Sequence, residues 1–355
     1  TGRMYLMNID HCNSHSSFTD KVEMSNLCQE ITLPTKPIQH IDDETGEIAL
    51  CILSAINIGK IRDLSDLESL CDLTVRSLDE LIDFQRYPVR AAEIATKARR
   101  SLGVGYIGLA HYLAKNGVGY EDKEAYKLVH DLSEAFQYNL IKATVQLAKE
   151  KGACEYSNRT KYHNGILPID TYKRDVDYLV KRKLTRNCNE IRKQLKEYGI
   201  RNSTLMALMP SETSSQISNA TNGIEPPRSY VSVKQSKDGI LKQVVPEYRN
   251  LRSKYELLWD QTSPEGYLKI VSVLQKYIDQ GISVNTSYNP QHYEDEKIPM
   301  SDMLKHLIMF YKFGGKQLYY FNTYDGATDD FDLKAPELAV AETVNNDEDC
   351  ESCVI

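Results

Sequence analysis

A long amphipathic helix is predicted over residues 122–151 and ends at Gly152. A second helical pattern runs through residues 64–113. Short apolar runs at residues 48–53 and 203–209 are typical of buried strands. These patterns indicate long helices interspersed with short strands.

The composition excludes several classes of protein. Hydrophobic residues make up 41% and charged residues 26% of the 355 residues, so wholesale disorder is excluded. The net charge of −7 argues against a general DNA or RNA binder, because a phosphate backbone attracts basic proteins. No apolar run is long enough to span a membrane and no leader-like segment opens the sequence. We therefore predict a cytoplasmic protein with no membrane partner.

The end of the sequence differs from the rest. Acidic residues dominate and large apolar residues are few beyond residue 326, which predicts a flexible acidic tail over residues 327–355 after a folded domain over residues 1–326. The tail carries Cys350 and Cys353, the one closely spaced pair among eight cysteines. Such a pair suits dithiol exchange or half of a metal site. A four-thiolate zinc site needs a second close pair, so we predict exchange and expect no metal.

An amide, a thiol and a carboxylate alternate at Asn26, Cys28 and Glu30. In an extended segment alternate side chains share one face, so these groups are expected to project together. A carboxylate can act as a base, a thiol as a nucleophile or hydrogen-atom donor, and an amide as an orienting group. The commoner alternative is a structural cysteine beside two surface polar residues. Local sequence likewise favours a packed core thiol at Cys51.

Residues 210–216 gather hydroxyl groups and backbone amides ahead of a predicted helix. Amides at the start of a helix favour anions, and the Ser and Thr side chains of this segment add donors. The alternative is an ordinary capping box, with Thr213 as the cap and Gln216 three residues later.

Three glycines at residues 103, 105 and 108 match the GxGxxG spacing of dinucleotide-binding loops. That motif requires a preceding apolar strand, whereas residues 95–102 are basic and have a helical pattern. We therefore reject a dinucleotide site and attribute the glycines to close helix packing.

Two adjacent phenols, Tyr319 and Tyr320, lie in a short aromatic segment that is predicted to be a strand. Such a pair could relay an electron and a proton if a redox-active group lies at each end. A purely structural pair is the alternative, because the chain has 23 tyrosines.

Together these segments resemble the large (alpha) subunit of the class I ribonucleoside-diphosphate reductases, in its bacterial and phage branch. The resemblance covers nearly the whole chain in the right order, and it is most specific over its longest stretch. It rests on Ser25–Glu30, Gly46–Cys51, Leu102–Gly105, Asn202–Leu205, Met209–Arg228 and Leu318–Tyr320.

The resemblance implies reduction of ribonucleoside diphosphates to deoxyribonucleoside diphosphates, for DNA synthesis, by a thiyl-radical mechanism. Cys28 would carry the radical that abstracts the 3′ hydrogen of the substrate. Glu30 would take the 3′-hydroxyl proton, and Asn26 would bind the ribose hydroxyls. Cys51 would be one of two cysteines that reduce the 2′ carbon and become a disulfide.

Further roles follow from the same resemblance. The substrate diphosphate would be held by Ser211, Glu212, Thr213 and Ser214. Tyr319 and Tyr320 would pass the radical from a small (beta) subunit, which would hold the metal-radical cofactor, whereas this chain would bind none. Cys350 and Cys353 would reduce the active-site disulfide and be recharged by thioredoxin or glutaredoxin, although two residues separate them where four are expected.

The implied fold is the second half of a ten-stranded α/β barrel with a central finger loop. The family's N-terminal half, with its nucleotide-binding regulatory sites and the partner of Cys51, has no counterpart in this sequence, so a separate N-terminal half is an expected partner. One competing interpretation is a non-catalytic interaction module derived from such a barrel. Another is a fragment of a cobalamin-dependent reductase, which would not need the tyrosine pair.

Overall fold

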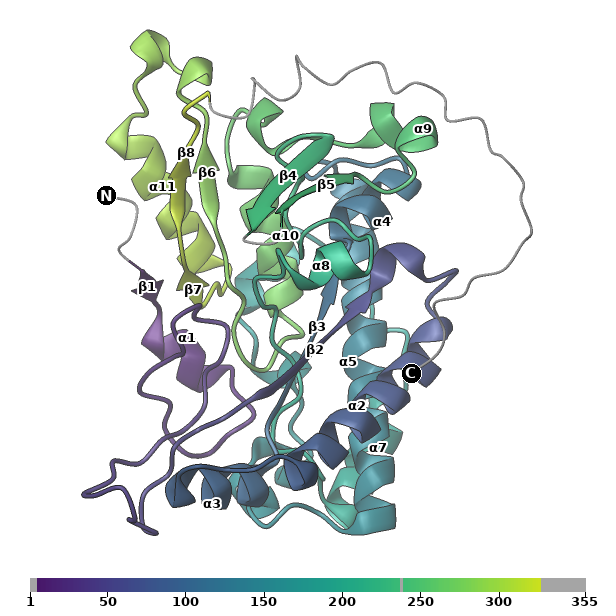
Figure 1. The fold of residues 1–355 in the computed structure, drawn as a ribbon. Coiled ribbons are helices and arrows are strands. Elements are labelled where there is room, and N and C mark those ends of the chain that lie inside the picture. The colour runs from purple at the N-terminus through teal and green to yellow at the C-terminus, as the bar shows by residue number, and fades with distance from the viewer. Residues whose placement is uncertain (1–4, 237–238, 327–355) are drawn as a thin grey trace, which may run out of the picture.

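The computed structural model describes residues 5–236 and 239–326 (Figure 1). The strands are β1 (Leu6–Met7), β2 (Ile52–Asn57), β3 (Leu102–Ile107), β4 (Val231–Ser236), β5 (Gly239–Val244), β6 (Thr286–Tyr288), β7 (Gln317–Leu318) and β8 (Phe321–Thr323). The helices are α1 (Ile9–Ser14), α2 (Asp66–Phe84), α3 (Arg90–Arg99), α4 (Leu109–Lys115), α5 (Lys123–Lys151), α6 (Pro168–Thr171), α7 (Cys188–Tyr198), α8 (Ser214–Ile217), α9 (Tyr248–Leu251), α10 (Glu265–Gln275) and α11 (Met300–Lys312), besides short 3₁₀ turns.

Successive stretches of extended chain lie side by side in chain order, with parallel pairing between them. β2 pairs with β3 along the whole length of both strands. Residues 204–208 follow beside β3, and residues 280–284 follow beside those. β6 then pairs in parallel with β8, and Tyr319 N donates to Val284 O at 2.7 Å just before β8. Parallel strands joined by helical connections define an α/β fold.

Long helices cover one side of this sheet. In Figure 1, α2, α5 and α7 lie beside β2 and β3, whereas β6, β8 and α11 form the opposite flank. The ring of Tyr106 on β3 meets Phe136 on α5 edge to face, with centroids 5.1 Å apart. The predicted helix over residues 122–151 is confirmed as α5, and Gly152 follows it with a positive φ of 86°.

The helical prediction for residues 64–113 is wrong in part, because β3 lies within that range. The attribution of the glycines to helix packing is also wrong, since Gly103 and Gly105 belong to this strand. A Cβ at Gly103 would lie 2.9 Å from Cys51 Sγ, and one at Gly105 would lie 2.6 Å from Ala207 O. Both glycines therefore let neighbouring extended segments approach closely.

Strand β2 also begins later than the sequence predicts. The apolar run at 48–53 suggests a strand over those residues, but β2 runs from Ile52 to Asn57. Ile48 N instead donates to Ala91 O, at the start of α3. Apolar character alone does not locate a strand's boundaries, because the hydrogen-bonding partner decides them.

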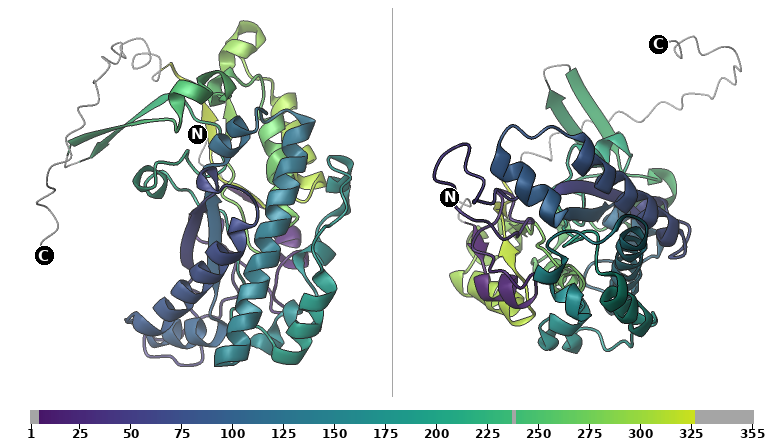
Figure 2. Two further views of the ribbon diagram at one scale, coloured as in Figure 1. Left: turned by 90° about the vertical axis from the view of Figure 1, so that its right-hand side faces the viewer. Right: turned by 90° about the horizontal axis from the view of Figure 1, so that it is seen from below.

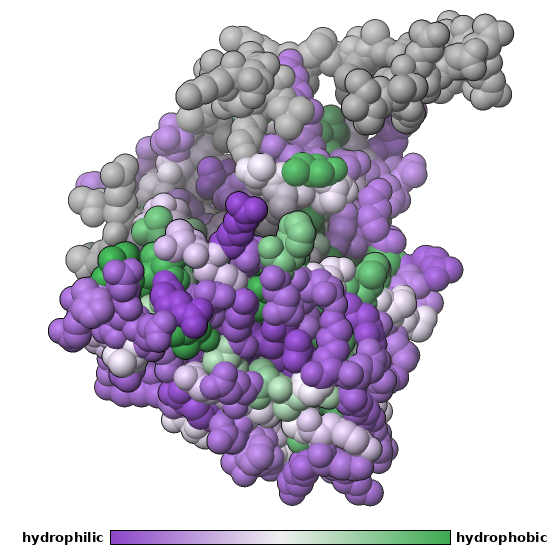
Figure 3. All heavy atoms as spheres, turned by 60° about the horizontal axis from the view of Figure 1, so that its bottom comes forward, coloured by the Kyte–Doolittle hydropathy of each residue, from purple (hydrophilic) through white to green (hydrophobic). Residues whose placement is uncertain are grey.

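The hairpin of β4 and β5 projects from the body of the molecule in both views of Figure 2. The face shown in Figure 3 is mostly hydrophilic, with small groups of hydrophobic residues between the polar ones. Within the described part of the chain, no helix has both the length and the apolar character needed to cross a membrane.

Candidate functional site

The segment with Cys28 is a tight loop. Asn26 N donates to Ile31 O, and Ile31 N donates to Asn26 Oδ1, each at 3.1 Å. Gln29 between them has a positive φ of 69°. The predicted extended segment is therefore wrong, because the backbone closes on itself. The groups also differ in exposure, since Asn26 is exposed, Cys28 is partly buried and Glu30 is 2% exposed.

The base of this loop is held against the sheet. Glu30 O accepts from Gly281 N at 2.8 Å, where any Cβ on Gly281 would collide with Gln29 O. A small apolar cluster packs at the base of the loop. It contains Phe18, Val22, Ile31, Leu33 and Ala207. The loop therefore rests on the third and fourth extended stretches, so its tip has a defined position.

Cys28 lies beside the tyrosine pair, 291 residues away in sequence. The distance from Cys28 Sγ to the Tyr319 hydroxyl is 3.6 Å, and the Tyr319 hydroxyl donates to the Tyr320 hydroxyl at 3.1 Å. Because Tyr319 has one hydroxyl hydrogen, the thiol is left to donate to the Tyr319 oxygen. Burial raises the pKa of Tyr319 far above its usual value, so its phenol stays protonated at neutral pH. The three side chains form a continuous hydrogen-bonded series.

A third phenol joins this series and was not found from the sequence. The Tyr5 ring lies with its centroid 4.7 Å from that of Tyr319 and 5.6 Å from that of Tyr320. A hydrogen bond with Tyr320 raises the pKa of Tyr5. The position of Tyr5 in a strand-like run close to the start of the chain gives no sign of this contact. The antiparallel pairing of β1 with β7 brings it there.

Ser283 also reaches the loop without any sequence signal. Its hydroxyl lies 2.5 Å from Cys28 O and 3.0 Å from Glu30 Oε2. A hydroxyl has one hydrogen, so Ser283 donates to one of these oxygens at a time. Ser283 thus lies where its hydroxyl can hold either the Glu30 carboxylate or the Cys28 carbonyl.

Cys51 lies directly before β2, and its Sγ lies close to Gly103 on β3. Its Sγ accepts a hydrogen bond from Gln280 Nε2 at 3.7 Å. Burial raises the pKa of the Cys51 thiol well above its usual value, and the carboxylates of Asp279 and Glu30 add to this effect. Cys51 is partly buried and its sulfur has a polar neighbour, so it differs from the packed core thiol that the local sequence suggests.

The segment at 210–216 forms a loop and the single turn of α8. The capping-box alternative is wrong, because the Thr213 side chain makes no hydrogen bond that caps α8. Ser211 is buried, and its backbone carbonyl accepts from Ser215 N at 2.9 Å. Glu212, Thr213 and Ser214 are exposed, and Glu212 borders a pocket of about 370 Å³ between this loop and the β4–β5 hairpin.

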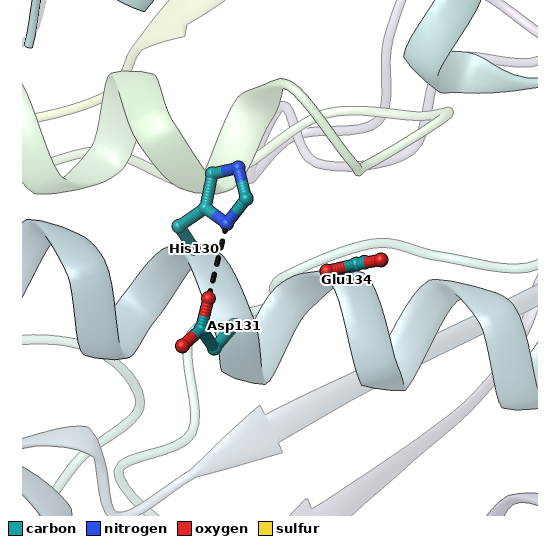
Figure 4. Close-up of side chains that lie close together, drawn as sticks. All are labelled: His130, Asp131 and Glu134. Carbon is teal, nitrogen blue, oxygen red and sulfur yellow. Dashed lines mark hydrogen bonds and ion pairs between the residues drawn. The ribbon is translucent and has the colours of Figure 1, made fainter. Parts of the chain in front are cut away.

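One group of possible metal ligands occurs among the described residues. His130, Asp131 and Glu134 of α5 place one ligand atom each within 4.8 Å of one another (Figure 4). His130 Nδ1 lies 3.3 Å from Asp131 Oδ1, and His130 Nε2 lies 2.8 Å from the Tyr277 hydroxyl. Burial lowers the pKa of His130.

The two carboxylates of this group are bound by the segment before α7. Arg182 makes two hydrogen bonds to Asp131. Glu134 accepts from the backbone amides of Thr185 and Arg186. The ligand atoms already have these protein partners, so the arrangement attaches residues 182–186 to α5 and does not fit an open metal site.

The described residues bring Asn26, Cys28 and Glu30 into one loop and place the tyrosine pair against it. Cys51 is close enough for the Glu30 carboxylate to affect its pKa. The tail thiols Cys350 and Cys353 lie outside the described residues.

The site therefore consists of a thiol on a loop held against the parallel stretches, in contact with the buried Tyr319, which in turn meets the exposed Tyr320. The model of the family "Ribonucleotide reductase, barrel domain" matches residues 1–253 and 248–321. The chain belongs to this family.

Curated relatives agree with this membership. Ribonucleoside-diphosphate reductase subunit alpha of Haemophilus influenzae is 62% identical over 93% of the chain, and the match covers 44% of that relative. Ribonucleoside-diphosphate reductase 1 subunit alpha of Escherichia coli K12 is 54% identical over 99% of the chain, and the match covers 46% of that relative. Ribonucleoside-diphosphate reductase subunit alpha of enterobacteria phage T4 is 42% identical over 99% of the chain, and the match covers 46% of that relative. The chain thus spans slightly less than half the length of these relatives.

Proposed function

We propose that this chain provides the substrate-reducing part of a ribonucleoside-diphosphate reductase, which converts ribonucleoside diphosphates to deoxyribonucleoside diphosphates for DNA synthesis. The observation that carries the proposal is the unbroken series from Tyr320 through Tyr319 to Cys28, with steps of 3.1 and 3.6 Å. Relatives that carry this enzyme's name match almost the whole chain.

In this proposal a metal-radical centre in a separate small (beta) subunit supplies the oxidising equivalent. Once Tyr320 has lost an electron and a proton, it would take a hydrogen atom from Tyr319. Tyr319 in turn takes the hydrogen atom of the Cys28 thiol, which leaves a sulfur radical. Each transfer breaks one O–H or S–H bond and forms one O–H bond, so the hole moves inward without net loss of atoms.

The substrate steps would use the residues around the loop. The Cys28 radical abstracts the 3′ hydrogen, and Glu30, held by Ser283, takes the 3′-hydroxyl proton. Asn26 has an exposed side chain that could contact the ribose. Cys51 and a second cysteine would supply two electrons and two protons. One proton leaves with the 2′-hydroxyl as water, one hydrogen stays on the 2′ carbon, and the two sulfurs become a disulfide. Cys28 would then return the hydrogen atom to the 3′ carbon and become a radical again.

The remaining residues would bind the diphosphate and restore the thiols. Hydroxyls and amides of Ser211, Thr213 and Ser214 are the proposed diphosphate donors, with Glu212 in the same loop. Cys350 and Cys353 would exchange with the active-site disulfide and be reduced by thioredoxin or glutaredoxin. The free state of the six described cysteines fits a reducing, cytoplasmic location.

The parallel stretches would form one half of a ten-stranded barrel, and a separate N-terminal half would form the other. A complementary half could cover three exposed large hydrophobic residues: Leu27 on the Cys28 loop, Leu50 just before β2, and Leu53 in β2. That half would also supply the thiol partner of Cys51. The contact of Cys28 with Tyr319, which donates to Tyr320, favours delivery of the radical from a protein partner over a cobalamin cofactor.

The test is reconstitution. The purified chain is mixed with CDP, dithiothreitol and small subunit, with and without a polypeptide that corresponds to the N-terminal half of the Escherichia coli relative. We expect deoxyribonucleotide only when both partners are present, because reduction at the 2′ carbon needs two thiols. Full activity without the N-terminal half would contradict the half-barrel proposal and the role of Cys51. No activity under any condition, with binding of both partners verified, would contradict the enzymatic function.

A further inference from the structure

Glu225 lies between the loop at 210–216 and the tyrosine pair, and the roles proposed above do not include it. The side chain is partly buried and borders the pocket of about 370 Å³ that also adjoins Glu212. Each of its carboxylate oxygens accepts a hydrogen bond from a different asparagine. Asn285 Nδ2 donates to Oε1 at 2.6 Å, and Asn222 Nδ2 donates to Oε2 at 3.3 Å.

Both asparagines continue the chain of hydrogen bonds in opposite directions. Asn222 Oδ1 accepts from the buried Ser211 hydroxyl at 3.1 Å. Asn285 Oδ1 accepts from the backbone N–H of Tyr320 at 3.2 Å. Four hydrogen bonds therefore lead without interruption from the proposed diphosphate loop to the outer tyrosine of the relay.

We propose that Glu225 is a positioning residue that couples occupancy of the diphosphate loop to the placement of Tyr320. The proposal rests on the function proposed above, because it takes the loop at 210–216 as the site of a nucleoside diphosphate. A bound diphosphate attracts the hydroxyl of Ser211, which now donates to Asn222. The Asn222 amide then turns, the Glu225 carboxylate follows, and Asn285 carries the shift to the Tyr320 backbone.

The chemistry of this series makes a carboxylate necessary at residue 225. A carboxylate accepts through both oxygens, so it can hold two amide donors at once. An amide in its place offers one acceptor oxygen and one NH₂ group, and that NH₂ group faces another donor. Burial raises the pKa of Glu225 to about 7, the Asn285 hydrogen bond and Arg228 oppose this effect, and Glu212 adds to it. Asn285 and Arg228 thus favour the charged form, and Asn222 donates to its other carboxylate oxygen.

Two substitutions break the series at different links. Glu225→Gln leaves one asparagine facing an NH₂ group, and Asn285→Ala removes the contact with the Tyr320 backbone. The matched control is Glu256→Gln. Glu256 also has a pKa that burial raises, and it also accepts two hydrogen bonds, from Tyr120 N and Gln261 Nε2, but it lies outside the series.

The experiment places 3-fluorotyrosine at position 320 of the reconstituted enzyme and records its ¹⁹F signal with and without CDP. The affinity for CDP is measured on the same samples. We expect CDP to shift the signal in the parent and in Glu256→Gln. In Glu225→Gln and Asn285→Ala we expect CDP to bind with an affinity within about threefold of the parent, while the shift is lost and kcat falls at least about tenfold.

An unchanged CDP-dependent shift in either folded variant of the series would overturn the coupling and leave the proposed function intact. A shift lost equally in Glu256→Gln would also overturn it, since the effect would then be structural. If the parent itself binds no CDP, the proposed function fails, and the coupling fails with it. Circular dichroism of each variant verifies folding, and the two substitutions act at separate links, so one folded variant is sufficient.

Discussion

Two regions of this chain bring reactive side chains together, and they differ in what those side chains already bind. Around His130, Asp131 and Glu134 the ligand atoms are occupied by an arginine, a phenol and backbone amides. Around Cys28 the thiol meets a phenol that passes its own hydrogen to the next phenol. The first region holds residues 182–186 against α5. In the second, hydrogen bonds connect Cys28, Tyr319 and Tyr320 in a line along which a hydrogen atom can move. Proximity alone therefore does not identify a reactive centre.

The largest effect that separates the two regions is expected at the phenols. Either Tyr319→Phe or Tyr320→Phe should abolish turnover of the reconstituted enzyme, because Phe keeps the ring and has no phenolic hydrogen to transfer. Binding of CDP should persist. Turnover is measured as deoxyribonucleotide formed, and binding by equilibrium dialysis.

A control for these variants is Tyr87→Phe. Tyr87 donates its hydroxyl hydrogen to Ile82 O, next to the end of α2, and has no contact with the relay. This variant should turn over near the parent rate. If both relay variants match it, the tyrosine pair is structural.

The next largest effect is a pH-dependent change in stability at Glu225, which Asn285 connects to the Tyr320 backbone. Its pKa in the folded chain is about 7, above the ordinary Glu value of about 4.3. A raised pKa contributes stability that is complete below the unfolded value and is lost as the pH rises through the folded value. From about pH 5 to about pH 8, the parent should lose up to about 3 kcal/mol more unfolding free energy than Glu225→Gln. Urea unfolding of the two chains measures this, and parallel pH profiles would contradict it.

The smallest effect is expected in the region that we regard as structural. Asp131→Asn weakens the ion pair with Arg182, whose two side chains are 24% and 43% exposed, so the stability loss should be about 1 kcal/mol. Turnover should not change, and Zn²⁺ should not raise the melting temperature of the parent. A loss of turnover, or a Zn²⁺-dependent increase in melting temperature that Asp131→Asn removes, would show that this region also has a functional role.

The strongest helical pattern was predicted from the sequence, and so was the grouping of Asn26, Cys28 and Glu30, which lie in one loop. Helix α5 follows its apolar periodicity, since its buried face needs no distant partner to be recognised. Asn26, Cys28 and Glu30 were identified together, although for the wrong geometric reason, because an alternating pattern does not reveal a loop that closes through Asn26 and Ile31.

The residues that sequence reasoning missed depend on contacts across the chain. Tyr5, Ser283 and Asn285 reach the site through strand pairing between segments that are distant in sequence. Strand β3 was missed because its glycines lower its apparent strand character, and their function is to admit Cys51 and Ala207. Local patterns carry no record of such close approaches.

One pair of variants tests whether Cys28 is the cysteine that reacts with substrate. Deoxyribonucleotide formation is measured for Cys28→Ser and for Cys188→Ser, a control at the start of α7 that is also a partly buried free thiol. An alcohol O–H bond is too strong to replace a thiol S–H bond in hydrogen-atom transfer. We expect no product from folded Cys28→Ser and near-parent product from Cys188→Ser. Appreciable turnover by Cys28→Ser would contradict this role of Cys28.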